Sequence, residues 1–68
     1  YTTLFRSKMK KIIILNFETS EVHVFPYDEK LYFDYEEFYV AALEDYGLDF
    51  KDSYCDCMIV DDLNIQIH

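Results

Sequence analysis

The amino-acid sequence predicts an α+β domain of the order ββαββ, in which one helix packs on one face of a four-stranded, largely antiparallel sheet. Two pairs of short apolar segments support this prediction, 11–17 with 22–25 and 54–60 with 63–67. Each pair is joined by a few polar residues, as the strands of a hairpin are. Between the pairs, apolar residues recur at helical spacing over 35–46. A chain of 68 residues with one glycine and one proline has room for a single domain without a linker.

The first hairpin is predicted from an isoleucine-rich strand at 11–17 and the return strand that follows it. Residues 19–20 are expected to form the turn, which places Phe17 opposite Val22. Pro26 is expected to end the return strand, because proline lacks the amide hydrogen that a sheet ladder uses.

The helix is predicted from its apolar stripe and from the residues at its two ends. Asp34 is a favourable N-cap, and Glu37 stands three residues later, where a capping-box acid belongs. Phe33 is expected to pack on Phe38 as a hydrophobic staple, and Gly47 is expected to end the helix in a left-handed conformation. The stripe consists of Tyr35, Phe38, Tyr39, Ala42, Leu43 and Tyr46.

The second hairpin is predicted from two strands joined at Asp61 and Asp62. A tight turn there places Val60 opposite Leu63. The last strand shows the strict alternation of a half-buried strand. Its apolar positions are Leu63, Ile65 and Ile67, and its polar positions are Asn64, Gln66 and His68.

The two faces of the predicted sheet carry different sets of side chains. The core is expected on one face, packed against the helical stripe, and contains Ile13, Leu15, Phe17, Val22, Val24, Met58, Val60, Leu63, Ile65 and Ile67. The other face, which a single helix cannot also cover, carries Ile12, Ile14, Phe25, Cys55, Cys57 and Ile59. Because exposed apolar patches beyond a few hundred Å² usually mark an interface, we expect an interface at Ile12, Ile14, Phe25 and Ile59.

Residues 1–8 are predicted to be a non-native N-terminal extension, and residues 9–68 the single small α+β domain. Met9 is followed by two lysines and an apolar run, as a natural start would be. The segment from Tyr1 to Ser7 resembles the in-frame translation of a common sequencing adapter. Segments of that kind are excluded from fold reasoning.

The charge and the cysteine content exclude several classes of function. Fourteen acidic residues against six lysines and arginines give a net charge of −8, which argues against direct binding to a nucleic-acid backbone. No apolar run approaches the ~20 residues of a membrane-spanning helix, so we expect no membrane partner. The chain shows no secretory signal pattern, and its two cysteines fit a reducing compartment, so a cytoplasmic location is expected.

Cys55 and Cys57 are the nearest candidates for a metal site. On a strand both thiols point to the same face, and the predicted hairpin places His68 opposite Cys55. A structural zinc site takes four ligands at a different cysteine spacing, so we expect packing residues here, with no metal and no cofactor. His23 is expected to be packed or solvated. No catalytic set is indicated, and the protein is predicted not to be an enzyme.

From Met9 onward the chain resembles short uncharacterised proteins of gut anaerobic bacteria and their mobile elements. The resemblance is carried by the segments MKKIIILNFETSEVHVFPYD and MIVDDLNIQIH and by the acidic, aromatic helix between them. It implies a small bacterial protein of one domain. It implies no activity and no functional residue, because no activity is attached to that group.

The function predicted from these features is that of a small non-enzymatic protein-interaction module. Its expected partner is a second copy of itself, through the uncovered sheet face or a sheet edge, or else another protein. The alternative is an acidic inhibitor that mimics nucleic acid and blocks a basic protein. The two differ in salt dependence, since charge-driven binding weakens as salt rises and an apolar dimer survives high salt.

Overall fold

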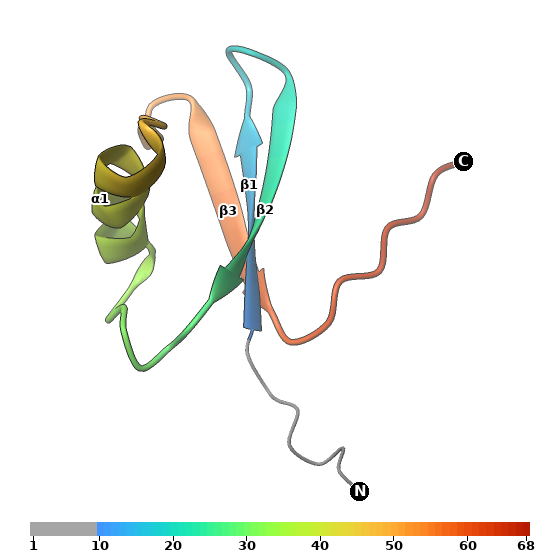
Figure 1. Ribbon diagram of the computed structural model, residues 1–68. Helices are drawn as coiled ribbons and strands as arrows, with labels where there is room; N and C mark the ends of the chain where they lie inside the picture. The colour runs from blue at the N-terminus through green and yellow to red at the C-terminus, as the bar shows by residue number, and fades with distance from the viewer. Residues whose placement is uncertain (1–9) are drawn as a thin grey trace, which may run out of the picture.

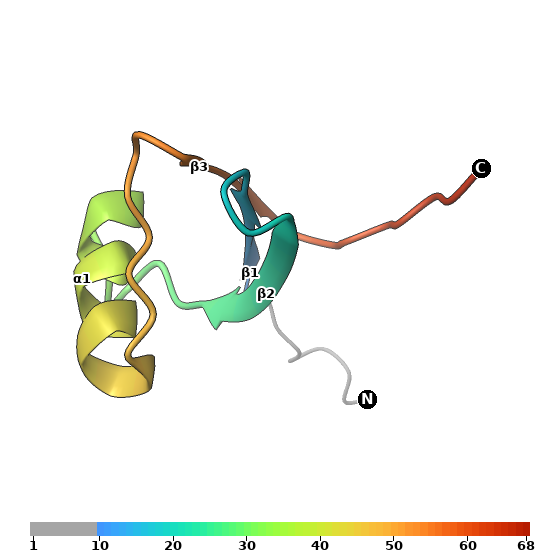
Figure 2. The ribbon, with the colours of Figure 1, turned by 90° about the horizontal axis from the view of Figure 1, so that it is seen from above.

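The structure is a computed structural model that describes residues 10–68. Its elements are β1 (Lys10–Asn16), β2 (Glu21–Tyr27), α1 (Tyr35–Tyr46) and β3 (Cys55–Val60). The three strands form one antiparallel sheet in the order β2-β1-β3, and α1 lies on one side of it (Figures 1 and 2). The fold is therefore α+β of the order ββαβ. The predicted extension 1–8 lies outside the described residues.

The prediction of a fourth strand is wrong. After β3, residues 61–68 form no strand, and the sheet has three strands rather than four. The chain instead leaves the end of β3 as an extended segment (Figure 1). A two-residue hairpin turn needs positive φ angles, but only Ser20 and Gly47 have them within 10–68. Asp61 and Asp62 therefore do not make the tight turn that would return the chain along β3.

The first hairpin forms, but in a register different from the predicted one. Leu15, not Phe17, lies opposite Val22, so the pairing is shifted by two residues. The turn consequently spans 17–20, and the Asn16 side chain organises it. Its Oδ1 atom accepts hydrogen bonds from the backbone amides of residues 18 and 19, at 2.9 and 3.1 Å. Because the side-chain period of a strand is two, this shift changes the cross-strand partners but leaves each side chain on the same face of the sheet as its predicted neighbours.

Pro26 lies inside β2, opposite Lys11, and does not end the strand as predicted. The sheet tolerates it because β2 is an edge strand.

The predicted helix and both of its ends are confirmed. The Asp34 side chain accepts a hydrogen bond from the Glu37 amide at 3.2 Å. Glu37 in turn accepts one from the Phe33 amide at 2.8 Å. Gly47 has a φ of 71° and ends the helix through its amide, which donates to Leu43. The predicted staple is wrong, since the Phe33 side chain is exposed.

The helix covers the face of the sheet opposite to the predicted one. Ile12 and Ile14 are completely buried beneath α1. The remaining members of this buried cluster are Tyr27, Phe38, Tyr39, Ala42, Phe50 and Cys55. Both faces of the sheet are apolar, so strand alternation alone separates the two sets without saying which one the helix meets. The aromatic residues decide it, because the ring of Phe25 in β2 packs at a tilt against the ring of Phe38, with the ring centroids 5.3 Å apart.

The α1–β3 connection completes this core. Phe50 lies 5.7 Å from Tyr39 and 5.2 Å from His23, between ring centroids. Aromatic rings from β2, α1 and the connection thus fill one layer between helix and sheet. Within 10–68, no helix combines the length and the apolar character needed to cross a bilayer.

Candidate functional site

The candidate site is the face of the sheet that α1 leaves uncovered, which we call the open face. The strand pairings arrange its side chains in three rows across β2, β1 and β3. The rows are Pro26–Lys11–Val60, Val24–Ile13–Met58 and Val22–Leu15–Asp56. Six of these nine side chains are branched aliphatics or methionine.

The central row shows how the open face is built. Ile13 is only 6% exposed although no helix covers it, because its neighbours on both sides shield it. Val24 and Met58, which provide that shielding, remain 42% and 54% exposed. In the next row Leu15 and Val22 are also exposed. The open face is therefore a continuous apolar surface in contact with water.

The charges on the open face are few and lie at its ends. Lys11 and Asp56 are its only ionisable side chains, in the first and the last row. The Asp56 carboxylate accepts a hydrogen bond from the Cys57 amide at 2.9 Å. The strongly acidic character of the chain is thus carried mostly elsewhere, by α1 and by the segments outside the strands.

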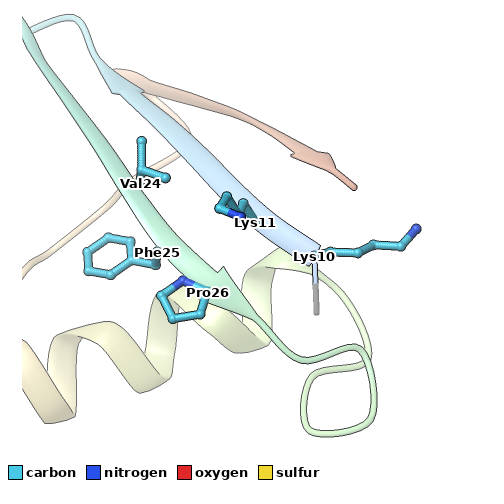
Figure 3. Close-up of a pocket in the computed structure, with 5 residues that line it drawn as sticks. All are labelled: Lys10, Lys11, Val24, Phe25 and Pro26. Carbon is cyan, nitrogen blue, oxygen red and sulfur yellow. The ribbon is translucent and has the colours of Figure 1, made fainter. Parts of the chain in front are cut away.

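A shallow pocket of about 290 Å³ adjoins the open face where β1 and β2 pair. Its lining residues are Lys10, Lys11, Val24, Phe25 and Pro26 (Figure 3). Lys10 extends away from the other four side chains (Figure 3). The pocket therefore presents mainly apolar carbon, with the Lys11 side chain at its margin.

A second pocket of about 410 Å³ lies beside the start of α1 and is lined by Tyr27, Tyr32 and Tyr35, among others. Lys10 reaches its rim, where its Nζ lies 3.1 Å from Glu29 and 3.5 Å from Asp61. The hydrogen bond to Glu29, with the negative charge of Asp61, raises the pKa of Lys10. These exposed pairs contribute little to stability but tether the root of the C-terminal segment to β1.

The four residues predicted as an interface are brought together, but on the covered side of the sheet. Ile12 and Ile14 are fully buried there. Phe25 packs on Phe38 and on Tyr46, and Ile59 is the most accessible of the four. An interface on this chain remains a prediction. The sheet face that could form one is the open face, and not the face that carries these four residues. The sequence pattern places the six aliphatic and methionine side chains of the open face together on one face, as observed, but predicts that they form the core.

The cysteines lie on the helix-covered face, with Cys55 opposite Asn16 and Cys57 opposite Ile14. His68 ends the extended C-terminal segment and does not pair with Cys55, since the fourth strand is absent. Within 10–68, no three side chains of the types that bind metals gather into a possible site. Burial raises the pKa of the Cys57 thiol, so the unreactive thiol form dominates at neutral pH.

His23 also lies on the covered face, opposite Ile14. Its Nε2 atom lies 3.1 Å from the Glu21 carboxylate, and its ring meets Phe50 edge to face. The imidazole is thus packed and hydrogen-bonded within the strand, as expected for a structural histidine.

Comparisons of the chain with protein-family models, with curated proteins and with solved structures found no match. The open face and the segments around it are the features of the described residues that point to a function.

Proposed function

We propose that this protein is a small, non-enzymatic protein-interaction module that associates with a second copy of itself through the open face. The observation that carries the proposal is the central row, in which Val24 and Met58 stay exposed on both sides of Ile13. The largest exposed apolar patch of a small protein is often a functional surface, and interaction sites are commonly built on one. In a closed dimer, a two-fold axis would bring the same patch of both copies together.

The energetic argument favours covering this surface. Three strands spaced ~4.8 Å apart, with about 3.3 Å per residue, give an open face of roughly 300 Å². At about 25 cal/mol per Å², burial of this whole area would contribute at most about 7 kcal/mol per copy before the costs of association, because Lys11 and Asp56 occupy part of it and Ile13 is already shielded. A chain of 68 residues has a small core, so even part of this contribution is large beside its own stability.

The charge distribution is compatible with this mode of association. Two copies that each carry a net charge of −8 repel one another at long range, but the open face itself carries only Lys11 and Asp56. Salt screens the long-range repulsion and leaves the apolar contact in place. The proposed dimer therefore becomes tighter as salt rises. The alternative acidic mimic of nucleic acid would bind a basic partner more weakly under the same change.

The proposal includes a cytoplasmic location. The two cysteines support it, because both are free thiols in the structure and such thiols persist in a reducing compartment.

The test compares two identical substitutions on two different surfaces. Val24 lies on the open face and is 42% exposed, and Val40 is an exposed valine on α1, 60% accessible, away from that face. Sedimentation equilibrium should show a dimer for the wild-type chain and for Val40→Lys, and a monomer for Val24→Lys. Circular dichroism establishes that each variant is folded. A monomeric wild type, or a Val24→Lys variant that dimerises as well as Val40→Lys, would refute the proposal.

A further inference from the structure

We propose that residues 61–68, which we call the C-terminal arm, pack onto the open face of the second copy, so that the two copies exchange arms. This inference rests on the proposed self-association and says how the interface is completed. It assigns a role to a segment that is extended, apolar at alternate positions and, beyond the half-buried Leu63, exposed on its own domain.

The side chains of the arm are arranged for one-sided contact. In an extended chain, alternate residues point to the same side, so Leu63, Ile65 and Ile67 share one side of the arm. Ile65 is 67% exposed and Ile67 is 90% exposed, so their own domain does not bury them. An extended segment with this pattern gains stability when another surface covers its apolar side.

The direction of the arm favours a surface on another molecule. The arm leaves the end of β3 on the side of the sheet opposite α1 and then runs away from the sheet, as both views show (Figures 1 and 2). Its root follows directly from Val60, which pairs with Lys11 of β1, and the Asp61 carboxylate lies 3.5 Å from Lys10 Nζ. The arm thus starts at the open face of its own copy and projects to where a copy docked on that face would lie.

The size of the interface gives an independent reason for the arm to take part. A stable interface buries about 800 Å² on each partner. The open face alone, whose projected area is roughly 300 Å² by its strand dimensions, is a smaller patch than such an interface covers. The five residues from Leu63 to Ile67 span about 17 Å when extended, which is enough to cross a three-stranded sheet. Because a two-fold dimer is reciprocal, each copy would both donate an arm and receive one.

The first test is a matched pair of substitutions within the arm. Ile65→Asp and Asn64→Asp each add one negative charge, one on the apolar side of the arm and one on its polar side. We expect Ile65→Asp to raise the dimer dissociation constant about tenfold or more, since it removes the apolar contact that one isoleucine makes in the proposed interface. Asn64→Asp should change it less than about twofold. Equal weakening by both variants would mean that added charge is responsible, and would overturn the inference.

The second test shows which molecule the arm touches. In a dimer of one ¹³C-labelled and one unlabelled copy, isotope-filtered NMR detects contacts between copies alone. We expect such contacts between the methyl groups of Ile65 and those of Val24 or Met58. The same contacts found only within one copy would show that the arm covers its own domain, and the inference would be wrong.

The outcomes separate this inference from the proposed function. If the full chain dimerises, Val24→Lys abolishes the dimer and removal of residues 63–68 leaves the dissociation constant unchanged, the open face is the interface and the arm is not part of it. If the full chain is monomeric, the proposed function itself fails, and the exchange of arms falls with it.

Discussion

At the scale of single residues, the least favourable feature of the core is the hydroxyl of Tyr39. The ring lies between α1 and the sheet, where it contacts Tyr35 and Phe50. The hydroxyl is buried and makes no hydrogen bond of good geometry among the described residues, and the polar group beside it is the Cys57 thiol, which is a weak hydrogen-bond partner. A buried polar group without a partner costs about 1–3 kcal/mol.

Replacing Tyr39 with phenylalanine should therefore raise the free energy of unfolding by about 1 kcal/mol at neutral pH. Urea denaturation followed by circular dichroism measures the difference. Tyr35→Phe is the matched control, because its hydroxyl donates a long hydrogen bond to Asp52, at 3.4 Å. A Tyr39→Phe variant less stable than the wild type would show that the hydroxyl has a partner in solution.

Because Tyr39 is buried, we also expect the protein to lose stability in alkaline solution. Burial raises the pKa of Tyr39 well above its ordinary value near 10, and also raises the pKa of Cys57. Since both groups are neutral when protonated, unfolding lets them ionise more easily. Their contribution is complete below the pKa values of the unfolded chain and is lost as pH rises above about 8.5 for the thiol and about 10 for the phenol.

The free energy of unfolding should accordingly decrease from about pH 8.5 upward, and the decrease above about pH 10 should be smaller in Tyr39→Phe. Urea titrations at a series of pH values test this expectation. Parallel pH profiles for the two proteins would show that the phenol does not drive the loss.

For the cysteines, the sequence predicted that they share a face but not which residue lies opposite them. That Cys55 and Cys57 share a face followed from strand periodicity alone, and the structure agrees. The partnership of His68 with Cys55 depended on a hairpin that the structure does not contain, so it failed together with that hairpin.

At the scale of elements, sequence reasoning worked best where the signal is local. The ends of α1 are specified by neighbouring residues, with Asp34 at one end and Gly47 at the other. The predicted register of the first hairpin was wrong by two residues. The register depends on the hydrogen bonds that Asn16 accepts from the turn amides, and strand propensity does not predict these contacts. The alternation over 63–67 predicted a strand, but a strand also needs a neighbouring strand with which to pair, and the part of the chain that the structure describes provides none for this segment.

The cap at Asp34 gives a direct prediction for α1. Asp34→Ala removes the acceptor of the Glu37 amide and should lower the free energy of unfolding by about 1 kcal/mol. Glu44→Ala removes the same charge from an exposed helix position and should change stability by much less. Urea denaturation of the two variants measures both effects. Equal changes would mean that charge, and not the cap, is responsible.

At the scale of the whole molecule, the orientation of the helix was beyond local pattern. Alternation sorted the strand residues into two correct sets, but both sets are apolar. The choice between them rests on how aromatic rings from distant segments, such as Phe25, Phe38 and Phe50, fit together. Such a fit involves residues far apart in the chain, and no periodicity encodes it.

If the protein is a dimer, its thermal stability should depend on protein concentration. Only the folded chain presents an intact open face, so association stabilises the folded state by mass action. The Tm of the wild-type chain should therefore rise as the concentration is increased, whereas that of Val24→Lys should stay constant. Differential scanning calorimetry at several concentrations measures both. A wild-type Tm independent of concentration would contradict association through this face.

Pro26 limits the kinds of assembly that this sheet can form. It pairs with Lys11 inside an edge strand, and a regular ladder accommodates proline where its missing amide would point outward. A further strand approaching β2 from outside therefore finds a gap in the row of donors. Growth into a filament requires two complementary free edges on every molecule. With one of its two edges interrupted, the protein is biased toward assemblies that close.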